Sequence, residues 1–503
     1  MVVLDYMRLK SGTDVRGVAI ETAEGGPVTL TDEAVIDIAR AFLVWCEKHL
    51  DIPANKLKLA VGRDSRLSGP RIAGALREAF VPYGVTCFDC GLASTPSMFM
   101  ATIDIPCDCA VQITASHHPF HRNGLKFFTK NGGLDSPELA EVLTLADERA
   151  CPHKFEGGSW QESNHMEQYA AHLRELIEKG INAPNYHRPL EGFHITVDAG
   201  NGAGGFYVEK VLAPLGADIS GSQFLEPDGS FPNHIPNPED KEAMGFASRA
   251  VIEPGADLGI IFDTDVDRAG VVDRHGREIN RNRLVALASA IALEGAPGGT
   301  IVTDSITSDG LREYIEGTLM GRHHRFQRGY KNVINEALRL NGEGVNCPLA
   351  IETSGHAALR ENYFLDDGAY LVTKIIIKLA ELRREGRELE DMLSELREPA
   401  EALEVRIPIL EQDFRSRGNE VIESLDAYSQ EKGWQTAPDN REGIRVSFPA
   451  GEGEGWFLVR LSVHDPILPV NIESDVPGGA DVIRGKLRDF FISESRGLDI
   501  SAL

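Results

Sequence analysis

The chain has 503 residues, more than one hydrophobic core usually serves, and this length predicts three or four domains. Hydrophobic residues make up 42% and charged residues 25%, which is typical of soluble globular proteins. The formal net charge of -26 argues against a nucleic-acid partner, because a phosphate backbone needs a basic surface. No apolar stretch approaches the roughly 20 residues of a membrane span and no signal peptide is evident, so we expect a cytoplasmic protein without a membrane partner.

The first part of the chain introduces a unit that is repeated. Residues 57–80 run from an apolar strand through a polar turn into a helix, and residues 193–216 and 300–319 follow the same order. Each copy is followed by a second apolar strand that ends in a loop rich in polar side chains, as in 109–119, 256–268 and 347–356. Continuous apolar runs are typical of strands covered on both faces, and ligands collect at the carboxyl ends of such strands.

The pattern changes after about residue 400. Four strand-like runs, two helical segments near 411–433 and 479–494, and a hairpin turn at PAGEGEG predict an α+β domain. The segment 388–399 reads as a helix that ends at Pro399, which predicts a hinge there. We therefore expect an α/β protein: three similar mixed-sheet α/β domains (1–165, 166–280 and 281–398) and an α+β C-terminal domain (399–503), arranged around a central cleft.

Ser116 is the candidate nucleophile of the first loop, TASHHPFHRNGLKFF. It directly follows a strand, beside the pair His117 and His118, and we expect it to be exposed and able to accept a phosphoryl group. Lys126, ten residues later, is a source of positive charge or of a proton. A serine that merely caps a turn is the alternative interpretation.

The second loop, IIFDTDVDR, carries three closely spaced carboxylates, Asp263, Asp265 and Asp267. They repel one another unless a cation neutralises them, and hard oxygen ligands favour Mg²⁺. A solvated acidic turn is the alternative, disfavoured by the apolar strand before the loop and by Arg268 directly after it.

Two later loops are weaker signals when taken alone. Glu352 and Ser354 in ETSGH offer hydrogen-bonding groups for sugar hydroxyls, and His356 offers a titratable ring. Arg460 and Ser462 in RLSVHDP suit a phosphate. An ordinary loop explains either segment equally well.

The four loops in this order resemble the α-D-phosphohexomutase superfamily, which includes phosphoglucomutase/phosphomannomutase. The segments SGTDVRG, VGRDSRLSG, LASTPS, PDGSFPNHIPNPE and RGYK add to the resemblance, which covers essentially the whole chain. It implies a phosphohexomutase that interconverts hexose 1-phosphate and hexose 6-phosphate, of glucose or mannose, through a phosphoserine and a bisphosphorylated sugar. A small phosphosugar is the implied partner.

The resemblance also implies roles for individual residues. Ser116, phosphorylated by a hexose bisphosphate, is the phosphoserine, and it shares Mg²⁺ with Asp263, Asp265 and Asp267. Lys126 and His356 are the acid/base candidates, and Arg16 is a further catalytic residue. The implied substrate-binding residues are His117, Arg268, Lys331, Glu352, Ser354, Arg460, Ser462 and His464.

The sequence departs from the family pattern at several positions. Thr264 and Val266 stand where the metal loop usually has glycines, and Val463, His464 and Asp465 replace Gly, Thr and Glu of the phosphate loop. These changes leave the sugar open, and phosphoglucosamine or N-acetylglucosamine phosphate is the alternative substrate. The sequence does not specify the oligomeric state.

Two enzyme classes compete with the mutase, and a non-catalytic binding protein is a third possibility that would leave the nucleophile, the metal carboxylates and the cationic residues unexplained. Gly200, Gly202 and Gly205 satisfy the GxGxxG pattern of dinucleotide-binding proteins, although we interpret them as packing positions between strand and helix. Asp263 at the end of an apolar strand is also the usual opening of an aspartate-nucleophile phosphatase. The spacing of Cys87 and Cys90 admits zinc, but residues three apart on a strand face opposite sides.

Overall fold

The computed structural model describes residues 5–23, 25–462 and 465–503. The chain divides into two compact units, one formed by residues 1–284 and 354–391 and the other by residues 285–353 and 392–503. Each unit is considered by itself.

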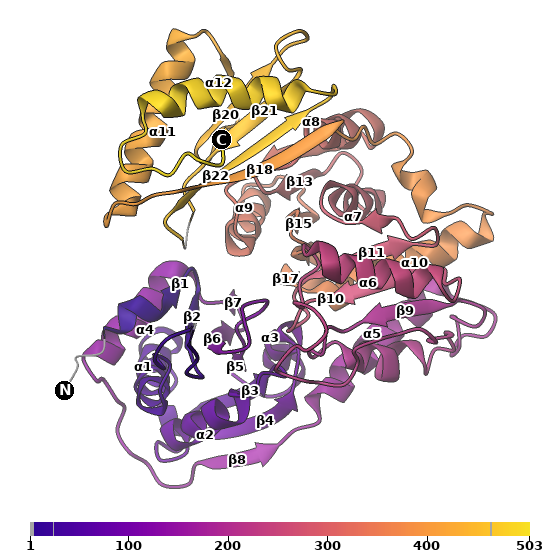
Figure 1. The fold of residues 1–503 in the computed structure, drawn as a ribbon. Helices are drawn as coiled ribbons and strands as arrows, with labels where there is room; N and C mark the ends of the chain where they lie inside the picture. The colour runs from indigo at the N-terminus through magenta and orange to yellow at the C-terminus, as the bar shows by residue number, and fades with distance from the viewer. Residues whose placement is uncertain (1–4, 24, 463–464) are drawn as a thin grey trace. The chain divides into compact units, whose positions relative to one another are not determined.

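The first unit begins with an eight-stranded mixed sheet in the order β1-β2-β6-β5-β3-β4-β8, with β7 paired to β6 (Figure 1). Its strands are β1 Lys10–Ser11, β2 Asp14–Val18, β3 Lys58–Arg63, β4 Thr86–Leu92, β5 Cys109–Ile113, β6 Arg122–Thr129, β7 Gly132–Gly133 and β8 Ser159–Glu162. The helices of this part are α1 Asp32–Leu50, α2 Gly69–Phe80, α3 Thr95–Asp104 and α4 Ser136–Asp147. Helix α3 packs against β3 and β5, whereas α1 packs against α2 and α4.

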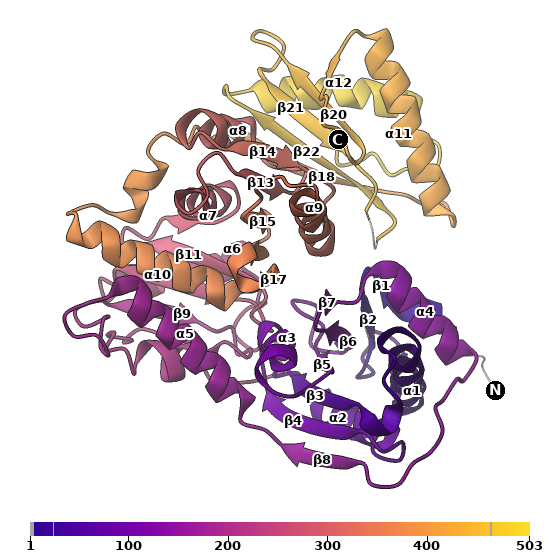
Figure 2. The same ribbon diagram turned by 180° about the vertical axis from the view of Figure 1, so that it is seen from behind.

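A second sheet of the same unit has the order β12-β11-β10-β9. Its strands are β9 Ile195–Asp198, β10 Leu258–Phe262, β11 Ala269–Asp273 and β12 Glu278–Ile279, and its helices are the π-helical segment Tyr207–Leu212 and α6 Lys241–Ile252. Helix α5, His165–Ile181, packs against α10, Gly368–Arg384, although about 200 residues separate them in the chain (Figure 2). The hairpin of β16 Ala357–Leu359 and β17 Leu365–Asp366 precedes α10. The packing of α10 against α5 explains why residues 354–391 belong to the first unit.

The second unit contains the parallel strands β14-β13-β15 and, after residue 392, an antiparallel sheet in the order β18-β22-β21-β20-β19. Helices α11 and α12 pack on the latter sheet and bury an apolar core against it (Figure 1). The elements are α7 Asn282–Glu294, which begins in the first unit, β13 Thr300–Thr303, α8 Asp309–Glu313, β14 Arg322–Arg325, α9 Tyr330–Gly342, β15 Leu349–Ile351, β18 Glu401–Pro408, α11 Phe414–Glu431, β19 Gln435–Thr436, β20 Ile444–Phe448, β21 Gly455–Val459, β22 Ile467–Ser474 and α12 Gly479–Ser493.

The predicted fold class is confirmed: three α/β domains precede a C-terminal sheet with helices. The strands that lead into the first three loops, β5, β10 and β15, are buried along their whole length, as expected for strands covered on both faces. One prediction was wrong: the expected helix over 388–399 is only the single 3₁₀ segment Leu389–Leu393. Leu389, Leu393 and Leu396 are buried although the segment forms no α-helix, so its apolar side chains pack from a 3₁₀ turn and the turn after it.

Candidate active site

Ser116 lies in the turn between the antiparallel strands β5 and β6. Its φ of 50° is in the left-handed region, which residues other than glycine seldom adopt. The fully buried Arg66 maintains this turn, because its guanidinium donates hydrogen bonds to the backbone carbonyls of residues 116, 118, 119 and 122. The expectation of an exposed serine was wrong for this structure, since Ser116 is only 6% exposed.

The Ser116 hydroxyl is surrounded by charged and titratable groups. It donates to Oδ2 of Asp263 at 3.1 Å, and Nη2 of Arg268 donates to it at 3.4 Å. Nδ1 of His117 lies 3.3 Å away. Burial and the neighbouring Arg268 hold the pKa of His117 well below its ordinary value, so this ring adds hydrogen-bonding capacity without a permanent charge.

Asp263, Asp265 and Asp267 lie in the turn between β10 and β11, and each is at most 1% exposed. Each carboxylate places one oxygen within 4.8 Å of the others. Thr95, at the start of α3, supports the turn by donating to Asp265 through its hydroxyl at 2.5 Å and its backbone N–H at 2.8 Å. Gly202 packs directly against this turn: a Cβ there would lie 2.6 Å from the Thr264 carbonyl, so the close contact is with the acidic loop.

The balance of charge differs among the three carboxylates. Burial and the two neighbouring carboxylates raise the pKa of Asp263 well above its ordinary value. Burial alone would also raise the pKa of Asp267, but Lys126, His356 and Arg268 lower it below its ordinary value. Nζ of Lys126, in β6, lies 2.6 Å from Asp267 Oδ2 and 3.7 Å from Asp265 Oδ2.

The acidic cluster of Asp263, Asp265 and Asp267 is suited to bind a divalent cation, because two of its oxygens lack a hydrogen-bond donor among the described residues. Oδ1 of Asp265 and Oδ1 of Asp267 are buried and have no hydrogen-bond partner within the described ranges. Buried carboxylate oxygens without a donor are costly, and hard cations such as Mg²⁺ are bound by such oxygens.

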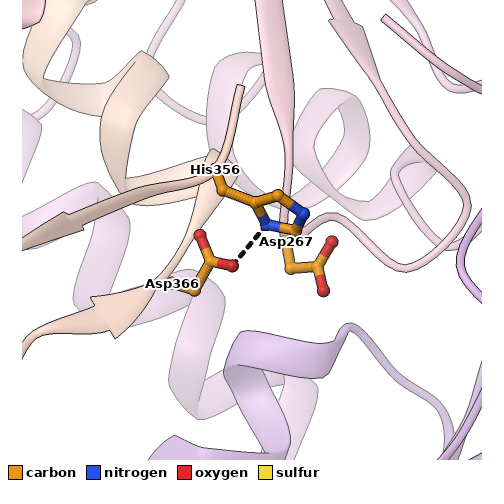
Figure 3. Close-up of side chains that lie close together, drawn as sticks. All are labelled: Asp267, His356 and Asp366. Carbon is orange, nitrogen blue, oxygen red and sulfur yellow. Dashed lines mark hydrogen bonds and ion pairs between the residues drawn. The ribbon is translucent and has the colours of Figure 1, made fainter. Parts of the chain in front are cut away.

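His356 joins this cluster from the segment before β16, where it forms a β-bridge with Arg268. Its Nδ1 is hydrogen-bonded to Oδ2 of Asp366, with Asp267 beside the ring (Figure 3). Burial lowers the pKa of His356, but Asp366 and Asp267 outweigh it and raise the pKa to about 9. Asp366 also accepts the backbone N–H of Ala357 at 2.9 Å, so the carboxylate is fixed at both oxygens.

Arg16, in β2, occupies a neighbouring position. Its Nη2 donates to Asp14 at 2.7 Å and its Nη1 donates to the Thr114 carbonyl at 3.1 Å, two residues before Ser116. The first unit therefore brings together nine of the predicted residues: Arg16, Ser116, His117, Lys126, Asp263, Asp265, Asp267, Arg268 and His356. Ser354 also belongs to this unit, and its buried hydroxyl has no partner within the described residues.

The remaining predicted residues lie in the second unit. Glu352, at the end of β15, accepts the backbone N–H of Gly329 at 2.6 Å, two residues before Lys331 at the start of α9. Glu442 accepts the N–H of Arg328 at 3.2 Å and lies 4.0 Å from Nε of Arg460. The RGYK segment thus connects the loop of Glu352 with the loop of Arg460.

The phosphate loop is described only in part. Burial lowers the pKa of Arg460, and the hydroxyl of Ser462 accepts the N–H of Asp465 at 3.2 Å. His464, predicted to bind substrate, lies outside the described residues. Sequence reasoning missed Asp366, which reaches His356 across the β16–β17 hairpin. It also gave no role to Arg66, which stands in the segment VGRDSRLSG and reaches the Ser116 turn 50 residues later.

Three models of phosphoglucomutase/phosphomannomutase α/β/α domains match the chain in succession: domain I over residues 8–149, domain II over 167–276 and domain III over 280–399. These are the domains that carry the serine, acidic and ETSGH loops. The chain therefore belongs to the phosphoglucomutase/phosphomannomutase family, a family of isomerising phosphotransferases.

Individual relatives span nearly the whole chain. A phosphomannomutase/phosphoglucomutase of Pseudomonas syringae is 30% identical over 476 residues, 94% of this chain and 92% of its own length. A phosphoglucomutase of Neisseria gonorrhoeae is 28% identical over 94% of this chain and 95% of its own length. A crystal structure of a family protein from Burkholderia thailandensis shares the fold, with a TM-score of 0.78 at 24% identity, and the match covers 97% of this chain and 98% of that one. Within the described ranges, none of the helices has the length and apolarity needed to cross a bilayer.

Proposed function

We propose that this chain is a phosphohexomutase that interconverts hexose 1-phosphate and hexose 6-phosphate of glucose or mannose through phosphorylated Ser116. The observation that carries the proposal is the environment of the Ser116 hydroxyl, which lies 3.1 Å from Asp263 and 3.4 Å from Arg268. A nucleophile, a set of buried carboxylates and four cationic groups (Arg16, Lys126, Arg268 and protonated His356) in one buried cluster are the components that phosphoryl transfer needs.

Asp263, Asp265, Asp267 and phosphorylated Ser116 are the residues that would hold Mg²⁺. When bound, the cation supplies positive charge to the oxygens of the transferring phosphoryl group. The unpaired Oδ1 atoms of Asp265 and Asp267 support this assignment.

The side chains of this chain have separate tasks in the transfer. The P–O bond to Ser116 breaks as the free hydroxyl of the hexose monophosphate attacks phosphorus, and the proton of that hydroxyl is transferred overall to the departing Ser116 oxygen. Arg268 and Lys126 balance the charge of the phosphoryl oxygens. His356 carries a proton at neutral pH, since its pKa is about 9, and we assign it the role of acid. The second half-reaction returns the other phosphate of the bisphosphosugar to Ser116.

We assign substrate binding to five further residues. Glu352 and Ser354 suit the sugar hydroxyls, with Lys331 as a cation at the start of α9. Arg460 and Ser462 suit the phosphate that is not being transferred. We propose glucose or mannose as the hexose of the substrate, and the phosphates of amino and N-acetylamino sugars are the alternative.

An aspartate-nucleophile phosphatase is less well supported by this geometry. Asp263 accepts both the Ser116 hydroxyl and the guanidinium of Arg268 through Oδ2, so this oxygen is already engaged within the cluster. A phosphoaspartate is cleaved by hydroxylamine, whereas a phosphoserine is not, so hydroxylamine treatment of the labelled enzyme separates the two.

The direct test replaces the nucleophile. Ser116→Ala should lose nearly all mutase activity and should remain one phosphate lighter than the wild type after incubation with a hexose bisphosphate, by intact-mass measurement. Ser501→Ala, an exposed serine near the C-terminus, is the matched control. Normal turnover by the Ser116 variant would refute the proposal. A panel of hexose 1-phosphates with a trace of the bisphosphate then identifies the sugar.

A further inference from the structure

The guanidinium of Arg268 is fixed at three corners. Nε and Nη2 both lie 3.1 Å from Asp263 Oδ2, Nη2 also lies 3.4 Å from the Ser116 hydroxyl, and Nη1 donates to the side-chain carbonyl of Asn237 at 3.1 Å. Asp263 and Ser116 both belong to the reacting cluster. Asn237 does not, and it comes from a separate segment of the chain, residues 227–239.

We propose that Asn237 is a positioning residue that keeps Nη2 of Arg268 directed at Ser116. This inference rests on the proposed phosphoryl transfer from Ser116. A guanidinium is planar, so holding Nη1 fixes the direction of the other two nitrogens. The other acceptor near Nη1 is the carboxylate of Glu239, 3.8 Å away. Without the Asn237 amide, attraction to Glu239 would pull Nη1 and rotate the guanidinium about its contact with Asp263, which shifts Nη2 relative to Ser116.

Asn237 is itself held rigidly. Its side-chain oxygen also accepts the N–H of Glu239 at 3.0 Å, its own N–H donates to the Ile235 carbonyl at 2.8 Å, and its carbonyl accepts the N–H of Asp240 at 2.9 Å. These local bonds form the turn that leads into α6. An acceptor held on both sides in this way is preorganised to direct a long, flexible arginine side chain.

The middle of segment 227–239 is anchored by a buried pair. Nε2 of His234 lies 3.0 Å from Oδ1 of Asp198, at the end of β9, and both side chains are completely inaccessible to solvent. The ring of His234 also stacks on Phe246 with centroids 5.6 Å apart. This anchor fixes the position of Asn237 relative to the second sheet.

The beginning of the same segment contacts the residue that holds the Ser116 turn. The ring of Phe231 lies under the guanidinium of Arg66 at 5.2 Å, and a Cβ at Gly229 would lie 2.4 Å from the Ser65 carbonyl. Arg66 in turn binds the four carbonyls of the Ser116 turn. One segment therefore supports both partners of the Ser116–Arg268 contact, the serine through Arg66 and the arginine through Asn237.

The test measures the half-reaction in which phosphorylated Ser116 transfers its group to a hexose monophosphate. Wild type, Asn237→Ala and Asn237→Asp are labelled at Ser116 with a hexose bisphosphate, and label loss is followed by rapid quench at several sugar phosphate concentrations. Asn237→Ala should slow the transfer by about 10- to 100-fold, the effect of losing a hydrogen bond to a charged group. The half-saturating sugar phosphate concentration should change little, because Arg268 is directed at the phosphoryl group and not at the sugar.

The conservative variant and a matched control separate positioning from folding. Asn237→Asp keeps the acceptor and should recover most of the lost rate. Asn185→Ala, which removes an exposed amide that donates to Glu191 at 2.8 Å, should transfer at the wild-type rate. Wild-type transfer by Asn237→Ala, an aspartate variant no better than alanine, or a loss explained by a lower melting temperature would each overturn the proposal. If wild-type Ser116 takes up no label, the proposed function itself fails.

Discussion

Lys126→Met tests how the buried carboxylates are stabilised. Nζ of Lys126 is the cation that lies 2.6 Å from Asp267 and 3.7 Å from Asp265, and the three side chains are at most 5% exposed. Methionine preserves most of the volume of the stem but removes the charge. The change leaves Asp265 and Asp267 buried without this counter-ion.

Removing one partner of a buried ion pair costs about 3–5 kcal/mol, because the other charge remains desolvated. Thermal unfolding in the presence of a chelator should therefore show a midpoint lower by on the order of 10 °C. The deficit should shrink as the pH falls, because a protonated carboxyl group needs no counter-ion. Added Mg²⁺ should restore more stability to the variant than to the wild type, since the cation would replace the missing charge.

Lys210→Met is the matched control, because Lys210 pairs with Glu167 at 2.8 Å where both side chains are more than 40% exposed. An exposed pair contributes about 0–1 kcal/mol, so the control midpoint should hardly move. Equal shifts in the two variants, or a Lys126→Met deficit that grows as the pH falls, would refute the electrostatic reasoning.

Three further predictions concern the other groups of the site. Asp265→Asn should weaken Mg²⁺ binding by at least about tenfold in isothermal titration calorimetry, because one ligand charge is lost; unchanged affinity, or full activity of the wild type after exhaustive chelation, would contradict the metal assignment. In chelated enzyme, the raised pKa of His356 contributes stability that is fully present below about pH 6.5 and is lost as the pH rises through about 9, and Asp366→Asn should remove this window and lower the pKa of His356 as followed by NMR. Arg460→Ala should raise the KM for the sugar phosphate and release more bisphosphosugar in phosphorus NMR during turnover, and an unchanged KM with equal release would place the phosphate contact elsewhere.

The sequence predicted the parts of the fold that depend on local pattern. The buried strands β5, β10 and β15 are short apolar runs, and the loops that follow them carry the polar residues, so strand and candidate site were found together. The C-terminal strands and helices were predicted for the same reason. The segment 388–399 was mispredicted because Leu389, Leu393 and Leu396 have helical spacing, but the structure buries them from a 3₁₀ turn and the turn after it. Tertiary packing decided the backbone there, and local pattern did not.

The contacts that organise the site could not be predicted in this way. Asp366 reaches His356 across a hairpin, Arg66 reaches the Ser116 turn from 50 residues earlier, and Asn237 reaches Arg268 from a separate segment. None of these pairs shares a helical or strand spacing. Each depends on which loops the sheets bring together, and a single sequence does not contain that information.

The backbone of the site shows why sequence rules lose force there. Ser116 and Val266 have φ values of 50° and 66°, and a β-branched residue such as Val266 is especially disfavoured in this region. Such conformations cost on the order of 1–3 kcal/mol each and persist only where the surroundings determine them. Arg66 supplies four hydrogen bonds to the Ser116 turn, and at Val266 the side chain is fully buried while the carbonyl accepts the N–H of Gly368 at 3.1 Å. The strain at both turns is therefore offset by distant parts of the same unit, so the acidic loop keeps its geometry although valine stands where the family usually has glycine.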